Sequence, residues 1–154
     1  MSVSKRRTIA IIGAGQAGAQ AVMTLRAGGF DGRLFLIGEE GHPPYQRPPL
    51  SKRYLTGDVE PGRLALLPET FFDENDVTCE FSNGAIRLDV GSRRIELADG
   101  AEIAFDQALI ATGSKPRPLA VPGADHEGVF AIRNLADVNA MRPSLGRDGR
   151  AIII

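Results

Sequence analysis

A glycine-rich turn between an apolar strand and a helix constrains this chain more than any other feature. Residues 8–12 form a short apolar run rich in β-branched side chains, which is typical of a parallel strand buried on both faces. The run Gly13-Ala14-Gly15-Gln16-Ala17-Gly18 follows at once, and residues 17–25 favour a helix that the Gly28-Gly29 pair ends. A second apolar strand is predicted over residues 33–37. This order of elements predicts the start of a Rossmann-like parallel sheet.

The glycine turn has the residue types that a bound pyrophosphate requires. Gly13 lets the chain turn sharply off the strand, a Cβ at Gly15 would hold the backbone away from the ligand, and Gly18 lets the helix lie close to the sheet. The pyrophosphate rests on free amides at the positive end of the helix dipole, so no basic side chain is needed. With 18 glycines in the chain the bare pattern is weak, and its placement between strand and helix carries the prediction.

Glu39 strengthens the prediction of a dinucleotide site. It lies 21 residues after Gly18, at the end of the second strand, where an acid meets the adenosine ribose in dinucleotide folds. A carboxylate there can accept a hydrogen bond from a ribose hydroxyl and would repel a 2′-phosphate. The sequence therefore favours FAD or NAD over NADP.

Composition and charge exclude several other classes. The 154 residues are 43% hydrophobic and 24% charged, as in an ordinary soluble domain. A net charge of −1 argues against nucleic acid as a main partner, and no apolar run is long enough to span a membrane. His42 and His126 do not have the spacing of metal ligands, so no metal site is predicted.

The single cysteine, Cys79, points to a reducing, cytoplasmic location and excludes a redox-active cysteine pair within this chain. Nothing basic lies beside it in the sequence to lower its pKa. We therefore predict that it is a small core residue in a strand rather than a reactive thiol.

A proline-rich segment follows the second strand. Residues 43–49 contain four prolines, which make the segment stiff without secondary structure. Such a loop can hold Arg47 and Lys52 at a fixed point above a ligand, or it can be a rigid connector with solvated charges; the residues alone leave both open. A short helix capped by Ser51 is predicted to run through Leu55.

The rest of the chain predicts an antiparallel insertion and a return to the parallel sheet. A short helix after Pro68 precedes a meander of four strands, over residues 77–81, 85–90, 94–97 and 102–105. Residues 107–111 are predicted to be another buried strand. The small residues Thr112 and Gly113 at its end either admit a ligand to the backbone or form a tight exit turn.

The last part of the chain predicts one more helix and an unfinished strand. Asn134 is placed to cap a helix that Pro143 ends. The apolar run over residues 151–154 is unusual at a chain end, so we expect a chain cut as a further strand begins.

The block Tyr45-Gln46-Arg47-Pro48-Pro49-Leu50-Ser51-Lys52, together with residues 110–113, 121–123 and 132–137, resembles the NADH-dependent ferredoxin reductases of oxygenase systems, the putidaredoxin reductase type. Apoptosis-inducing factor is similar through the same block. The resemblance implies the N-terminal part of an FAD-binding domain over residues 1–150 and the start of a truncated NAD-binding domain over residues 151–154. It also implies FAD as cofactor and NADH as substrate of a longer parent protein. It also implies a [2Fe-2S] ferredoxin as partner, serving a P450 or a dioxygenase.

Residue roles follow from the same resemblance. Gly13, Gly15 and Ala17 lie along the FAD pyrophosphate, Glu39 at the adenosine ribose, and Arg47 at the adenosine and pyrophosphate side. The backbone of Ala85 meets the adenine, Thr112 and Gly113 approach the cofactor, and Lys52 and Arg133 lie near the flavin ring. No residue is predicted to act as a catalytic acid, base or nucleophile. The predicted cofactor-binding residues are Gly13, Gly15, Gln16, Ala17, Glu39, Arg47, Lys52, Ala85, Thr112, Gly113 and Arg133.

Two other functions are compatible with parts of this pattern. A flavin-binding signalling protein like apoptosis-inducing factor would share the proline-rich block. The NAD-binding domain of a simple dehydrogenase would share the glycine turn but has no need of that block.

Overall fold

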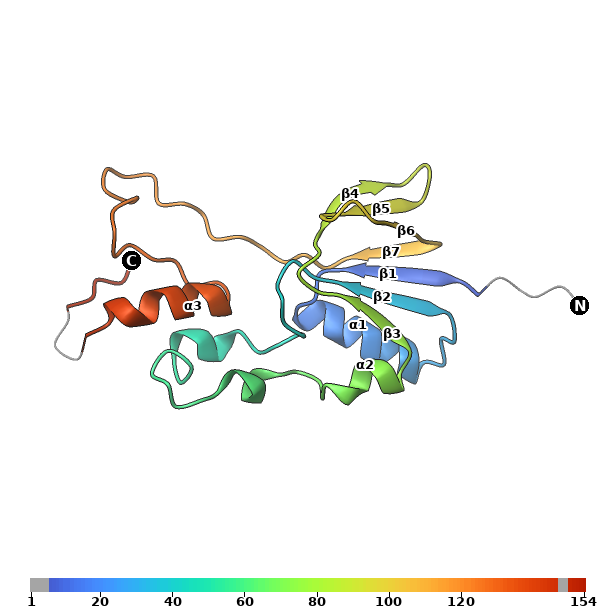
Figure 1. Cartoon of the computed structure of the whole chain (residues 1–154), viewed down its shortest axis with the longest axis horizontal. Coiled ribbons are helices and arrows are strands. Elements are labelled where there is room, and N and C mark those ends of the chain that lie inside the picture. The colour runs from blue at the N-terminus through green and yellow to red at the C-terminus, as the bar shows by residue number, and fades with distance from the viewer. Residues whose placement is uncertain (1–5, 147–149) are drawn as a thin grey trace, which may run out of the picture. The chain divides into compact units, whose positions relative to one another are not determined.

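The computed structural model describes residues 6–146 and 150–154, which form two compact units (Figure 1). The first unit comprises the chain up to Tyr45 together with Ala65–Gly113. The second comprises Gln46–Leu64 and Ser114–Ile154.

A parallel sheet with a helix after its first strand forms the centre of the first unit. Among the described residues its strand order is β3-β2-β1-β7, and all three pairings are parallel. The predicted strands over residues 8–12 and 33–37 and the helix between them are confirmed. The elements are β1 (Thr8–Ile12), α1 (Gln16–Ala27), β2 (Arg33–Ile37), β3 (Val77–Glu80) and β7 (Gln107–Ile110).

A second, antiparallel sheet of β4 (Ala85–Asp89), β5 (Arg94–Leu97) and β6 (Glu102–Ala104) is inserted before β7. The predicted meander is thus confirmed for three of its four strands. The assignment of residues 77–81 to it was wrong, because β3 pairs in parallel with β2, with Leu34 opposite Val77 and Ile37 opposite Glu80.

Alternation along β1 and β2 gives the first unit two hydrophobic cores. In both strands successive side chains point to opposite faces of the sheet. One set packs with α1 and with α2 (Thr70–Glu74), and the other packs with the antiparallel sheet, so the parallel sheet is the middle of three layers (Figure 1). The first set is Ile9, Ile11, Leu34 and Leu36, and the second is Ala10, Ile12, Phe35 and Ile37.

Strand β7 lies at an edge of the parallel sheet, and the prediction that it is buried was wrong. All four of its residues are exposed; Leu109 is 42% and Ile110 is 64% exposed. A continuous apolar run predicts a strand, but its burial depends on what lies beyond the edge. In the described part of the chain nothing pairs with the outer side of β7.

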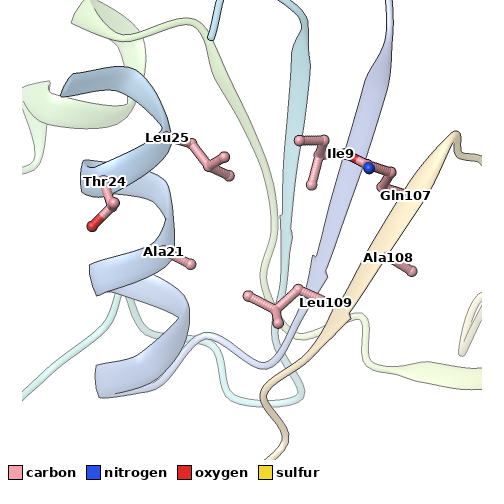
Figure 2. A pocket seen from close by; sticks show the side chains of 7 residues that line it. All are labelled: Ile9, Ala21, Thr24, Leu25, Gln107, Ala108 and Leu109. Atoms are coloured by element: carbon pink, nitrogen blue, oxygen red, sulfur yellow. The ribbon is translucent and has the colours of Figure 1, made fainter. Parts of the chain in front are cut away.

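An open, mostly apolar groove of about 600 Å³ runs between α1 and β7 on the face of the sheet that α1 covers (Figure 2). None of the predicted cofactor-binding residues lines it. The lining residues are Ile9, Ala21, Thr24, Leu25, Gln107, Ala108 and Leu109.

The second unit contains the proline-rich segment from Gln46 onward and α3 (Leu135–Met141). It also contains the short 3-10 helices η1 (Pro48–Ser51), η2 (Pro61–Leu64) and η3 (Arg142–Ser144). The helix predicted from Ser51 through Leu55 was wrong. The chain forms η1 and then a series of turns, because Pro48 and Pro49 favour a helix start three residues earlier.

Contacts between distant parts of the sequence hold the second unit together. The Tyr54 hydroxyl donates a hydrogen bond to Asn139 at 2.9 Å. The guanidinium of Arg142 lies over the Tyr54 ring, 4.6 Å from its centroid, and donates to the Tyr54 carbonyl. None of the helices in the described residues is both long and apolar enough to cross a membrane.

Candidate cofactor site

The glycine turn is fitted closely against the ends of three strands. The amide of Gly13 donates to the carbonyl of Ile37 at the end of β2 (2.8 Å), and Gly13 has a φ of +120°. A Cβ at this position would overlap the carbonyl group of Ala111 and lie 2.9 Å from the nitrogen of Thr112. Glycine is therefore required here both by backbone conformation and by the approach of the chain after β7.

Gly18 and Gly15 differ in the space around them. A Cβ at Gly18 would overlap the carbonyl oxygen of Gly13 and lie 3.2 Å from Leu36 Cδ1, so Gly18 lets α1 lie against β2. At Gly15 a Cβ would meet no heavy atom of the described residues within 4 Å, apart from its chain neighbours. The turn is therefore open on the side of Gly15.

The N-terminus of α1 provides backbone amides that can donate hydrogen bonds. Gly15 is its N-cap, no side chain caps it, and no acidic residue lies in its first turn. The amides of Gln16 and Ala17 thus belong to the unpaired first turn of a 12-residue helix, at the positive end of its dipole. Open space beside a glycine and uncapped amides fit a pyrophosphate group.

The end of β2 places Glu39 beside the turn. A Cβ at Gly38 would lie 2.7 Å from Ala14 Cβ, so the chain after β2 passes directly against the glycine turn. Glu39 is exposed, whereas Glu40 is half-buried and accepts a hydrogen bond from the Tyr45 hydroxyl. Of the two adjacent acids, Glu39 is the one at the surface.

The connection from β3 to β4 brings Ala85 to the same end of the sheet. The amides of Ser82 and Asn83 donate to the carbonyls of Glu40 and Gly38, both at 3.1 Å. Ala85, the first residue of β4, directly follows this connection. Sequence reasoning did not assign a role to the connection, although the adjacent Asn83 and Gly84 are typical turn residues.

In the first unit the structure thus gathers a connected set of predicted residues around the carboxyl ends of β1, β2 and β7. This is where ligands bind in open α/β sheets. Thr112 and Gly113 follow β7 there, and Gly113 has a φ of +71°. The predicted residues in this unit are Gly13, Gly15, Gln16, Ala17, Glu39, Ala85, Thr112 and Gly113.

The other three predicted residues, Arg47, Lys52 and Arg133, all lie in the second unit. The Arg47 guanidinium donates to the carbonyl of Arg133 at 2.7 Å, which joins the proline-rich segment to the turn before α3. The Lys52 ammonium donates to the Pro48 carbonyl at 3.2 Å and is otherwise exposed.

A capping box fixes the backbone at Arg133. Asn134 is the N-cap of α3, as predicted, and accepts from the amide of Asp137. The Asp137 carboxylate in turn accepts from the amides of Arg133 and Asn134, at 2.7 and 2.9 Å. Arg47 and Arg133 are 86 positions apart in the sequence, and no spacing rule could have predicted their contact.

Comparison with known proteins identifies the family. The family model described as pyridine nucleotide-disulphide oxidoreductase matches residues 7–154. The chain belongs to this family. The match covers the glycine turn, the antiparallel insertion and the proline-rich segment alike.

The chain is also similar to individual reductases. It is 40% identical over 147 residues to rhodocoxin reductase of Rhodococcus erythropolis, covering 96% of this chain and 34% of that protein. It is also 40% identical over 147 residues to the ferredoxin–NAD(+) reductase component of the biphenyl dioxygenase system of Paraburkholderia xenovorans, with 96% and 36% covered.

A solved structure gives the same result for the fold. The covalent putidaredoxin reductase–putidaredoxin complex matches with a TM-score of 0.85 at 28% identity, over 94% of this chain and 36% of that one. The chain thus spans about a third of the length of the relatives it matches. The predicted fold class, a Rossmann-like parallel sheet with an antiparallel insertion, is confirmed.

Proposed function

We propose that this chain is the FAD-binding portion of an NADH-dependent ferredoxin reductase, which passes electrons from NADH through FAD to a [2Fe-2S] ferredoxin of a P450 or dioxygenase system. The observation that carries the proposal is the glycine turn. It combines an open side at Gly15 with the uncapped N-terminus of α1, in a chain 40% identical to two reductases of this kind. When bound, the flavin supplies the redox chemistry, by accepting a hydride and releasing electrons singly.

The residues of the first unit bind the adenosine diphosphate part in this proposal. The amides of Gln16 and Ala17 hold the pyrophosphate with the help of the helix dipole. Glu39 accepts hydrogen bonds from the ribose, and the backbone of Ala85 contacts the adenine. Thr112 and Gly113 contact the cofactor from the chain after β7.

In this proposal the basic side chains of the second unit stabilise the negative charge of the cofactor. Arg47 assists at the adenosine and pyrophosphate side, and Lys52 and Arg133 lie near the flavin ring. A cation held beside the flavin stabilises negative charge on the reduced ring by electrostatic attraction. No side chain acts as an acid, base or nucleophile, and the protein's part is to position and tune the cofactor. We further propose a cytoplasmic location and a second, nucleotide-binding domain beginning at Ala151.

The first test is the visible spectrum of the natural protein that contains these residues, recorded before and after anaerobic addition of NADH. We expect flavin absorption that NADH bleaches and that a [2Fe-2S] ferredoxin restores. A yellow protein that NADH does not bleach would favour a non-enzymatic flavoprotein. A colourless protein would overturn the assignment of FAD.

A substitution at Gly15 tests the glycine turn itself. A Cβ there meets open space within the protein, so Gly15→Ala should leave the free energy of unfolding unchanged within about 0.5 kcal/mol. The same Cβ would crowd a pyrophosphate, and overpacking costs about 1–3 kcal/mol, so FAD affinity should fall about tenfold or more. Affinity is measured by quenching of flavin fluorescence on titration of the apoprotein.

Gly62→Ala is the matched control, because Gly62 is equally open and lies in η2, outside the predicted site. It should change neither stability nor affinity. Unchanged FAD binding by Gly15→Ala would remove the pyrophosphate from this turn.

A further inference from the structure

The Ser82–Gly84 connection between β3 and β4 packs directly against Glu39. We propose that Gly84 is a positioning residue that fixes Glu39, and that it thereby sets the preference of the site for an adenosine ribose with a free 2′-hydroxyl. This inference rests on the proposed function and assigns to it a specificity determinant on a neighbouring element.

Hydrogen bonds hold the backbone on both sides of Glu39. The amide of Gly38 donates to the carbonyl of Glu80 at 2.8 Å, and the carbonyl of Gly38 accepts from Asn83 at 3.1 Å. After Glu39, the carbonyl of Glu40 accepts from Ser82 at 3.1 Å. Because both neighbours of Glu39 are bound to β3 and to the connection after it, the position of Glu39 depends on that connection.

Gly84 is the residue whose side chain would reach Glu39. A Cβ at Gly84 would lie 3.3 Å from Glu39 Cβ and 3.4 Å from Glu39 Cα, closer than Cβ atoms ordinarily approach. The backbone of Gly84 is not in the left-handed region, so an alanine there is not strained by its own conformation. The three heavy atoms nearest to an added methyl group would all belong to Glu39.

The added methyl group would press Glu39 and Gly84 apart. The far side of the connection is tied to the antiparallel sheet, because Ala98 donates to the Gly84 carbonyl at 2.9 Å and Asp99 donates to the Asn83 side chain at 3.2 Å. The backbone on both sides of Glu39 is hydrogen-bonded as well. An alanine at 84 should thus change the position of Glu39 relative to the connection by a few tenths of an ångström.

A shift of Glu39 by this distance should affect its hydrogen bond with the ribose more than the other contacts of the cofactor. A hydrogen bond from a ribose hydroxyl to a carboxylate is short and directional, so it weakens as its geometry is lost. Glu40 already accepts a hydrogen bond from the Tyr45 hydroxyl, which directs its carboxylate toward Tyr45. The contacts of the pyrophosphate with the turn at Gly15 do not involve Gly84.

The test compares two ligands on the apoprotein of the natural chain that contains these residues. The ligands are FAD and the FAD analogue that lacks the 2′-hydroxyl of the adenosine ribose, and both dissociation constants are measured by flavin fluorescence. Hydrogen bonds to charged groups contribute about 1.5–3 kcal/mol, so the unaltered protein should prefer FAD by about tenfold or more. In Gly84→Ala this ratio should fall to about threefold or less.

The ratio separates positioning from general loosening of the structure. A variant that merely loosens the site weakens both ligands equally and leaves the ratio unchanged, which would overturn the inference. Gly62→Ala is the control and should keep the ratio of the unaltered protein. In a Glu39→Gln background the ratio should already be low, and adding Gly84→Ala should lower it no further; a further fall would show that Gly84 acts through another group.

The remaining outcomes separate this inference from the proposed function. If the unaltered protein binds FAD but does not distinguish the two ligands, Glu39 is not the ribose ligand and the inference is wrong, while FAD binding stands. If it binds neither ligand, both the proposed function and the inference are wrong.

Discussion

Cys79 illustrates how the surroundings of one side chain decide its chemistry. It lies in β3, half-buried against the core beneath α1 and α2, as predicted for a structural cysteine. Burial, followed by the nearby charges of Asp73 and Glu80, raises the pKa of the thiol from 9.0 to about 11. All three effects disfavour the thiolate, which is the nucleophilic form.

We therefore expect Cys79 to react slowly with a disulfide reagent in the folded protein. At pH 8 its rate should be at least about tenfold below that of the same protein in urea, because little thiolate is present. As a group whose pKa is raised on folding, Cys79 contributes stability below about pH 9 that is lost as the pH rises through about 11. Equal rates in buffer and in urea would contradict this environment.

At the scale of elements, Arg26 connects the end of α1 to two other segments of the first unit. Its guanidinium donates four hydrogen bonds to backbone carbonyls, two before β2 and two at the end of α2. The acceptors are Phe30 (2.6 Å), Gly32 (2.9 Å), Asn75 (2.7 Å) and Asp76 (2.8 Å). One side chain thus joins the α1–β2 connection to the α2–β3 connection.

Replacing Arg26 should destabilise the first unit. Arg26→Ala leaves four carbonyls without this partner, and hydrogen bonds to charged groups contribute about 1.5–3 kcal/mol, so we expect a loss of about 3 kcal/mol. Arg26→Lys should recover only part of it, since an ammonium cannot reproduce the planar set of donors. The free energy of unfolding in urea measures both. Arg63→Ala, at an exposed position in η2, is the control, and its free energy of unfolding should lie within about 0.5 kcal/mol of that of the unaltered protein. An equally small change for Arg26→Ala would refute the connecting role of Arg26.

At the scale of the whole molecule, local sequence patterns predicted where helices and strands lie. They did not predict which strands pair or which strands are covered. The strand, turn and helix over residues 8–27 were predicted correctly because each depends on residues close in sequence. Val77–Glu80 was predicted to be a strand but placed in the wrong sheet, since alternation does not reveal which strand lies opposite. The exposure of β7 likewise depends on what lies beyond an edge.

Part of the candidate site could likewise be predicted from local sequence patterns, and part could not. The glycine turn and Glu39 were predicted from spacing, because a glycine-rich turn and an acid at the end of the next strand are local consequences of one fold. The contact of Arg47 with the Arg133 carbonyl and the packing of Gly84 on Glu39 join segments far apart in sequence. Such contacts are fixed by the assembled fold and leave no short motif.

The pairing of β1 with β7 has a consequence for how the chain is made. In this pairing Ile9 lies opposite Gln107, and Ala111, just after β7, lies against Gly13. Ala111 therefore leaves the ribosome 98 residues after Gly13. The first helix and β2 have all their sequence much earlier, whereas closing so long a loop is slow. We expect the glycine turn to gain its final shape late in synthesis, after the helix that begins at it has already formed.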